Sequence, residues 1–124
     1  MSSLFNIENR EPLNWISINS LEGLNSALMG SEKPKVFFKH STRCGISVMA
    51  LKSFEKTFAN SNVDCELYYV DLLRYRDVSN KLEYITSVKH ESPQVLVLLN
   101  DKILYSASHS SIDAKQLEIK IEQA

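Results

Sequence analysis

Hydrophobic and polar residues alternate along this chain in short blocks, and the blocks predict strands and helices in turn. Runs of β-branched and aromatic residues are typical of strands, whereas apolar residues three or four positions apart are typical of a helix with one buried face. The predicted strands are residues 13–18, 36–40, 67–72, 95–99 and 103–105. The predicted helices are residues 21–30, 45–60 and 78–85, with a last helix that follows Ser110 or Ser111.

Each predicted helix has an apolar face suited to burial, and all but the helix of residues 45–60 have a polar residue suited to cap the start. Asn19 and Glu22 form a capping-box pattern before the first helix, and Asp77 or Ser79 suits the start of the third. Helices of this kind lay their apolar face on a sheet. The residues predicted to be buried are, helix by helix, Leu21, Leu24 and Leu28; Ile46, Met49, Ala50, Phe54 and Phe58; Val78, Leu82 and Ile85; and Leu117 and Ile121.

The order of the predicted elements indicates an α/β fold. Alternating strands and helices require parallel neighbouring strands joined by right-handed crossovers. Asn100-Asp101 suits a tight hairpin turn, so the last strand adds an antiparallel edge. We therefore predict a thioredoxin fold, in which a central mixed sheet of about five strands has helices on both faces. Residues 1–124 are predicted to form this single domain.

Composition narrows the partners that this domain can have. Apolar residues make up 44% and charged residues 23% of the 124 residues, as in an ordinary globular protein. Fourteen Lys and Arg balance fifteen Asp and Glu, which argues against a nucleic-acid binder. No apolar run approaches the ~18 residues of a membrane span, and residues 1–10 lack the pattern of a secretory leader. We therefore expect a cytoplasmic protein with neither nucleic-acid nor membrane partners.

Cys44 is the candidate reactive group. It lies between a predicted strand and the helix that begins at Gly45, where helix N–H groups and the helix dipole stabilise a thiolate. Lys39, His40 and Arg43 are close in sequence and would add positive potential or contact a substrate. A free cysteine can instead be a small buried core residue. The polar and small residues around Cys44 favour an exposed, reactive thiol.

Pro93 and two histidines are predicted to lie near Cys44. Ser92-Pro93 precedes a central strand that starts beside the Cys44 loop, which makes its peptide bond a candidate for the cis form, although only about 5% of X–Pro bonds are cis. The backbone of Ser92 could then pair with an extended substrate. His109, after the hairpin, is a candidate wall of the site and general acid for the leaving thiolate, or else a solvated loop residue. His90 either borders the site or merely belongs to the loop before Pro93.

The other cysteine does not complete a dithiol site. Cys65 begins a strand parallel to the one that Cys44 follows, which places the two thiols at opposite poles, about 20 Å apart. A disulfide needs Cα atoms within roughly 7 Å of each other. Ser47 stands where a dithiol oxidoreductase has its second cysteine, and a hydroxyl can hydrogen-bond the thiolate but cannot resolve a mixed disulfide. We therefore predict a monothiol mechanism, and no metal site, because the cysteines and histidines lack zinc spacing.

Three segments together resemble the monothiol bacilliredoxins of the bacillithiol redox system. They are residues 38–47 (FKHSTRCGIS), 88–94 (VKHESPQ) and 107–110 (ASHS), and the resemblance extends over residues 13–123. It implies a thioredoxin fold with Cys44 as the active cysteine and Pro93 in the cis-proline position. It also implies that Cys44 takes bacillithiol from S-bacillithiolated protein substrates, with bacillithiol as a co-substrate and no tightly bound cofactor.

One position departs from that family and keeps two other functions open. The family usually has proline after the active cysteine, where this chain has Gly45. Cys-Gly-Ile-Ser resembles the Cys-Gly-Phe-Ser of monothiol glutaredoxins, which use glutathione and hold an iron–sulfur cluster. Those proteins carry Thr-Val-Pro where this chain has Glu91-Ser92-Pro93, and a Gly-Gly stretch near residues 108–111. The third alternative is a non-enzymatic adaptor that docks partners on the Cys44 face.

Overall fold

The computed structural model describes residues 13–30 and 32–124, where five strands and four α-helices follow one another in the predicted order. The strands are β1 (Ile16–Ser17), β2 (Lys35–His40), β3 (Glu66–Asp71), β4 (Gln94–Leu99) and β5 (Lys102–Ser108). The helices are α2 (Leu21–Met29), α3 (Gly45–Phe58), α4 (Arg76–Thr86) and α5 (Ala114–Glu122), with a short 3₁₀ helix, η1 (His109–Ser111), before the last. The predicted alternation of strands and helices is confirmed.

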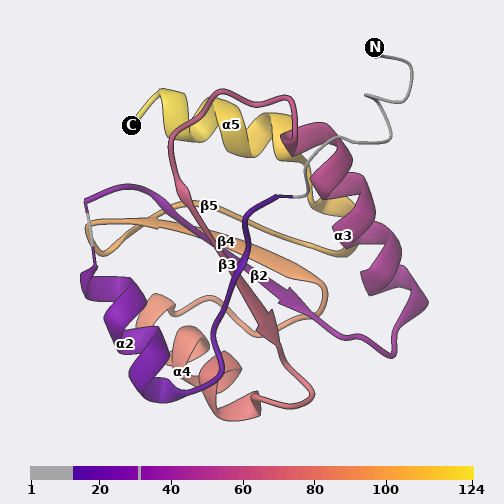
Figure 1. Cartoon of the computed structure of the whole chain (residues 1–124), viewed down its shortest axis with the longest axis vertical. Helices are drawn as coiled ribbons and strands as arrows, with labels where there is room; N and C mark the ends of the chain where they lie inside the picture. The colour runs from indigo at the N-terminus through magenta and orange to yellow at the C-terminus, as the bar shows by residue number, and fades with distance from the viewer. Residues whose placement is uncertain (1–12, 31) are drawn as a thin grey trace.

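The strands form one mixed sheet in the order β1-β3-β2-β4-β5. β2 pairs in parallel with β3, so that His40 lies opposite Asp71, and antiparallel with β4, so that Lys39 lies opposite Gln94. The ends of β2, β3 and β5 and the start of β4 consequently meet at one edge. α3 and α5 cover one face of the sheet, and α2 and α4 cover the other (Figure 1). This is the predicted thioredoxin arrangement.

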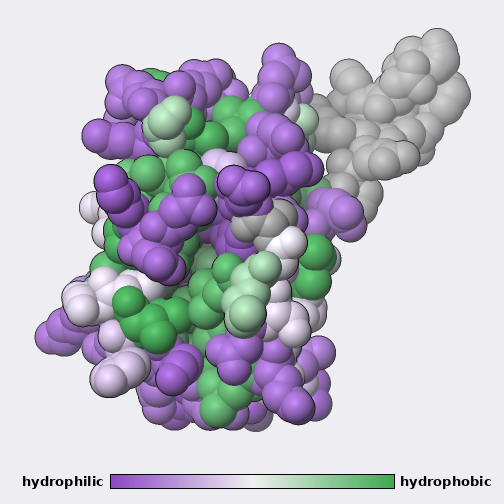
Figure 2. Space-filling model, turned by 90° about the vertical axis from the view of Figure 1, so that its left-hand side faces the viewer, coloured by the Kyte–Doolittle hydropathy of each residue, from purple (hydrophilic) through white to green (hydrophobic). Residues whose placement is uncertain are grey.

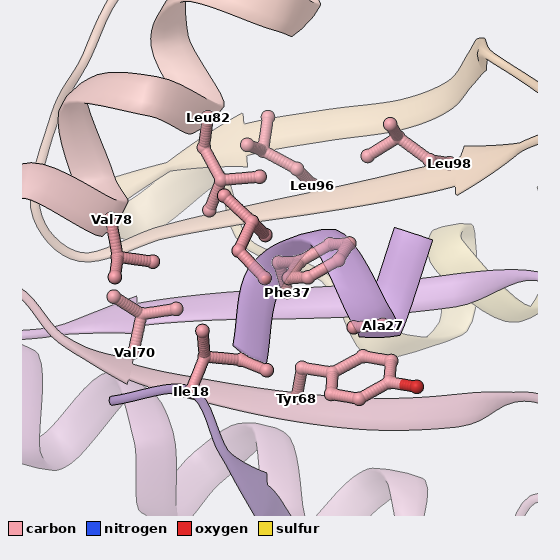
Figure 3. Close-up of a cluster of buried hydrophobic side chains, with 10 residues drawn as sticks. Ile18, Ala27, Phe37, Tyr68, Val70, Val78, Leu82, Leu96 and Leu98 are labelled. Atoms are coloured by element: carbon pink, nitrogen blue, oxygen red, sulfur yellow. The ribbon is translucent and has the colours of Figure 1, made fainter. Parts of the chain in front are cut away.

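Two hydrophobic clusters, one on each face of the sheet, hold the layers together. β2 is buried at every position, although Lys35, Lys39 and His40 are polar, and its side chains alternate between the two faces of the sheet. Phe37 belongs to the cluster beneath α2 and α4 (Figure 3). Val36 and Phe38 belong to the cluster beneath α3 and α5, where the rings of Phe38 and Phe54 meet edge to face at 5.5 Å. Packing from both faces therefore fixes β2 and the start of the loop that follows it.

The structure corrects the predicted helix caps. Ser20, not Asn19, caps α2, because its Oγ accepts a hydrogen bond of 2.9 Å from a backbone N–H in the first turn. α4 begins before Asp77, so Asp77 lies in its first turn and Ser79 is buried inside the helix. Asp113 caps α5, because the serines predicted for that role form η1 instead. Several short polar residues precede α2 and α5, and tertiary contacts decide which of them becomes the cap.

Some apolar residues predicted to be buried are exposed at the helix ends. Ile46 and Met49 expose 66% and 72% of their surface, and Leu21 and Ile85 are exposed as well. α3 begins beyond the end of β2, so its first turn extends past the sheet that covers its later turns (Figure 1). The same helix buries Phe54 and Phe58 as predicted.

The β4–β5 turn lies at the end of the sheet away from the start of α3. Asn100 and Asp101 have φ angles of 49° and 70°, which is the conformation of the predicted two-residue hairpin turn. Figure 2 shows this end of the molecule, where hydrophobic residues reach the surface among hydrophilic ones. Cys44 lies at the opposite end of the sheet, where α3 begins.

The described helices also bear on the expected partners. In residues 13–30 and 32–124, no helix is long and apolar enough to cross a membrane. The expectation that residues 1–10 form no leader concerns a segment outside the described residues. The assignment of residues 1–124 to a single domain stays a prediction.

Candidate active site

Cys44 is half-buried at the N-terminus of α3, beyond the carboxyl end of β2. A tight turn holds it: its N–H donates to the Ser41 carbonyl at 3.2 Å, and its own carbonyl accepts from the Val48 N–H at 3.0 Å. Cys44 is therefore the N-cap residue of α3, although its thiol makes no capping hydrogen bond. The structure therefore places the Cys44 thiol at the N-terminus of a 14-residue helix, as the sequence predicts.

Ser47, at the position of a second active-site cysteine, is fully buried. Its Oγ accepts a hydrogen bond from the Ser41 N–H at 3.1 Å and lies 2.8 Å from Nδ1 of His40. Burial lowers the pKa of His40 and so favours the neutral imidazole, whose Nδ1 can accept a hydrogen bond from the Ser47 hydroxyl. The hydroxyl therefore ties the Cys44 loop to the end of β2.

Ser47→Ala is expected to lower the free energy of unfolding by about 1–2 kcal/mol, because the Ser41 N–H and the His40 imidazole would both lose a buried hydrogen-bond partner. Urea denaturation followed by circular dichroism measures this change. Ser53→Ala, at an exposed position of the same helix, is the matched control and should change the free energy by less than ~0.5 kcal/mol. Equal stability of the two variants would show that the Ser47 hydroxyl does not hold the loop.

The loop before β4 lies at the same edge of the sheet as Cys44, because β4 runs antiparallel to β2. The Ser92–Pro93 peptide bond is cis, as predicted, and Pro93 is buried. The Pro93 carbonyl accepts a hydrogen bond from the His109 N–H at 2.9 Å, which joins this loop to η1. The Ser92 Oγ is buried and has no hydrogen-bond partner among the described residues. The cis-proline loop and η1 thus form one wall at the Cys44 edge.

His109 lies beside the first turn of α3. It is exposed, has a φ of 54°, and places Nδ1 3.2 Å from Oε1 of Glu91. With Ile46 and Met49 it lines a mainly apolar pocket of about 400 Å³. The sequence pointed to His109 but missed Glu91 as its partner and the two apolar side chains as the pocket wall. Helical spacing had assigned both side chains to the core, since spacing alone does not distinguish a buried apolar face from an exposed one.

Lys39 and His90 lie on the other face of the sheet, beneath α4. Lys39 is fully buried, and its Nζ donates to the Ser79 carbonyl at 3.2 Å and lies 3.5 Å from Nδ1 of His90. The same Nδ1 lies 2.9 Å from the Ser79 Oγ. Burial lowers the pKa of Lys39 to about 8, and burial together with the charge of Lys39 lowers the pKa of His90. The structure therefore places Lys39, like His40, where a substrate does not reach it, and engages His90 in an internal network.

Arg43 and Gly45 flank Cys44, and both are exposed. Arg43 lines a pocket of about 470 Å³ together with Thr42 and Arg74. A Cβ atom at Gly45 would meet no atom within 4 Å, so packing does not require glycine there. Glycine in place of the proline of the family consequently adds a backbone N–H next to Cys44 without altering the packing.

Cys65 directly precedes β3, at the end of the sheet opposite to Cys44, and both thiols are free. Burial and the neighbouring carboxylates of Asp64 and Glu66 raise the pKa of Cys65 to about 11, so its thiol stays protonated near neutral pH. The predicted placement of the two cysteines at opposite poles is confirmed. In residues 13–30 and 32–124, no group of three or more His, Cys, Asp or Glu side chains is placed to hold a metal ion.

The fold and the cysteine at the start of α3 define the class of protein, that of thioredoxin-fold proteins. A protein assigned as an oxidoreductase with a thioredoxin fold is 25% identical, and the alignment covers 95% of this chain and 98% of that one with a TM-score of 0.75. Thioredoxin NaTrxh of Nicotiana alata is 21% identical over 91% of this chain and 94% of its own, with a TM-score of 0.68. The thioredoxin Mala s 13 of Malassezia sympodialis is 18% identical over 92% of each chain, with a TM-score of 0.69.

Within this class, the family can be stated more narrowly. The family model of the monothiol bacilliredoxin BrxC matches residues 16–117, and the chain belongs to the monothiol bacilliredoxin family. Family and fold together give it a redox role in thiol–disulfide exchange, and the family links that role to a low-molecular-weight thiol. The resemblance seen in the three sequence segments is confirmed.

Proposed function

We propose that this protein removes bacillithiol from S-bacillithiolated proteins, with Cys44 as the catalytic thiol. The position of Cys44 carries the proposal: it is half-buried at the start of α3, while Cys65 lies at the opposite end of the sheet. A serine occupies the position of a second cysteine, so the mixed disulfide on Cys44 meets no neighbouring thiol and persists as an intermediate. Membership of the bacilliredoxin family favours bacillithiol as the small thiol.

The proposed reaction is an exchange of one disulfide for another. The Cys44 thiolate attacks the bacillithiol sulfur of the protein's mixed disulfide. An S–S bond forms to Cys44 as the old S–S bond breaks, and the electron pair leaves on the protein sulfur, which takes a proton from water or from His109. A second low-molecular-weight thiol then attacks the Cys44 mixed disulfide. That step releases the small-thiol disulfide and restores Cys44.

The protein substrate would dock on the cis-proline side of Cys44. The Ser92 backbone precedes the cis bond there, and an extended chain can pair with it by β-augmentation. Side chains of that chain would reach the apolar pocket that Ile46, Met49 and His109 line. These features support a protein disulfide, rather than a small disulfide alone, as the substrate.

The test is a transfer experiment on the reduced protein. A model protein that carries either a bacillithiol or a glutathione mixed disulfide is added, and the mass of each protein is followed by intact mass spectrometry. We expect bacillithiol to move to this protein and the model protein to emerge with a free thiol. Peptide mapping should place the adduct on Cys44.

The other outcomes discriminate between the alternatives. Preferred transfer of glutathione would favour a glutaredoxin-like function, to which the exposed Gly45 gives some support. Transfer from neither donor would overturn the proposed enzyme and leave the non-enzymatic adaptor as the better interpretation of the Cys44 face.

A further inference from the structure

A basic pocket opens at the carboxyl ends of β2 and β3, and Arg43, the residue before Cys44, is part of its lining. The loop after β2 contributes Thr42 and Arg43, the loop after β3 contributes Arg74, and the enclosed volume is about 470 Å³. A backbone hydrogen bond of 3.1 Å from the Leu72 N–H to the last residue of β2 holds the two loops side by side. The pocket therefore begins at the residue next to the reactive cysteine.

The lining of this pocket suits a carboxylate. Neither Arg43 nor Arg74 takes part in the ion pairs of the described residues. Asp71 also lines the pocket, but its Oδ1 accepts the Leu73 N–H at 3.2 Å, and two guanidinium groups outweigh one carboxylate. The Arg74 guanidinium lies 5.7 Å from the centroid of the Tyr75 ring, which restricts its orientation. A planar guanidinium offers paired N–H donors that match a carboxylate.

The other pockets at this edge have a different chemistry. Ile46 and Met49 give the pocket beside α3 an apolar wall. A third pocket, of about 670 Å³ along β5, is lined by the acidic residues Glu91 and Asp113. The basic pocket thus lies on the β3 side of β2, the strand that precedes Cys44, and the apolar pocket lies between α3 and the segment that follows β5.

A mixed disulfide between a protein and a small thiol presents two different groups, which two pockets of different chemistry can receive separately. The attacking, central and leaving sulfurs lie nearly in line, so the group carried by the central sulfur projects sideways from that line. We propose that the small thiol, which carries the central sulfur, projects into the basic pocket, where Arg43 and Arg74 bind its carboxylates. This inference rests on the proposed function. Bacillithiol, through its malate unit, and glutathione both carry carboxylates, and the pocket recognises that shared chemistry.

The experiment compares small disulfides of different charge. Reduced protein is mixed with bacillithiol disulfide or glutathione disulfide, which carry carboxylates, with neutral bis(2-hydroxyethyl) disulfide, or with cationic cystamine. Formation of the Cys44 mixed disulfide is followed by acid quenching and intact mass. Arg43→Gln and Arg74→Gln are compared with Arg76→Gln, which removes an exposed arginine at the start of α4 that does not line the pocket.

Each pocket variant is expected to slow the carboxylate disulfides about five- to ten-fold relative to the neutral disulfide. Cystamine should not be slowed, and Arg76→Gln should behave as the wild type. The two carboxylate disulfides are then compared with each other. Whichever of bacillithiol disulfide and glutathione disulfide shows the larger decrease in rate identifies the small thiol that the pocket holds. An equal slowing of all the disulfides would show that the arginines act only on the thiolate, and it would overturn the pocket while leaving the proposed function intact. Absence of any reaction in the wild type would overturn the proposed function and this inference together.

Discussion

Cys44→Ser should abolish the mixed disulfide and slow the release of the small thiol from a protein substrate by more than about a thousand-fold. The serine hydroxyl stays un-ionised near neutral pH and cannot form a disulfide bond. No other thiol compensates, because Cys65 lies at the far end of the sheet and its raised pKa keeps it protonated. The measurement is the rate at which free thiol appears on an S-bacillithiolated substrate, together with the intact mass of the variant.

Cys65→Ser is the matched control, since it also removes one sulfur but at the opposite end of the sheet. This variant should exchange at the wild-type rate. An adduct that forms on Cys44→Ser and maps to Cys65 would contradict the assignment of the catalytic thiol. Equal partner binding by the wild type and Cys44→Ser, without exchange by either, would instead indicate an adaptor.

The order of the elements could be predicted from the sequence because the core itself dictates the pattern. β4 is buried on both faces and appears as a nearly continuous apolar run, whereas α4 is buried on one face and shows helical spacing. β2 is predicted from the β-branched and aromatic residues at its centre, Val36 to Phe38. The helix starts could not be predicted to the residue. Asn19 and Ser20 have similar preferences for the cap position, and only the contacts of the folded chain select Ser20.

The site was predictable where topology alone determines position, as for Cys44 after the central strand and Pro93 before its antiparallel neighbour. The surroundings of Lys39 and His40 could not be predicted, because they depend on which face of β2 each side chain occupies. Lys39 and His40 are adjacent in sequence, but successive side chains of a strand point to opposite faces. Lys39 therefore lies beneath α4 and His40 beneath α3, although both resemble solvated residues at a strand end. The basic pocket needs Arg74, a residue distant in sequence that no local pattern connects with Cys44.

The burial of Lys39 leads to the second large effect: Lys39→Met should stabilise the protein at neutral pH and remove a dependence on pH. Burial lowers the pKa of Lys39 from 10.5 to about 8 in the folded protein. The folded state then binds fewer protons than the unfolded state between these two values, so the Lys39 contribution to stability rises with pH from about 8 to 10.5. Below that range the buried ammonium costs on the order of 3 kcal/mol, which methionine avoids while filling a similar volume.

The variant removes the hydrogen bond from Lys39 Nζ to the Ser79 carbonyl and the contact of Nζ with His90 at every pH, so only the pH-dependent part of the difference reports the charge of the amine. The His90 ring keeps its contact with the Ser79 Oγ, and the backbone N–H of His90 still donates to the Glu83 carboxylate at 3.0 Å. Urea denaturation at a series of pH values should show the advantage of the variant shrinking by on the order of 3 kcal/mol as the pH rises from about 8 to 10.5. Other groups that titrate in this range, among them Cys65, are present in both proteins and cancel in the difference.

Two further observations decide whether Lys39 is the cause. Lys56→Met, at an exposed position of α3, should follow the wild-type curve at every pH. The pKa of His90, followed by NMR, should rise in Lys39→Met, because the charge of Lys39 is one of the causes that lower it. Parallel stability curves for Lys39→Met and the wild type, with an unchanged His90 titration, would contradict a desolvated ammonium beneath α4. Curves that converge as the pH rises from about 8 to 10.5 would show that this fold tolerates a buried cation behind its active-site strand at a measurable cost in stability.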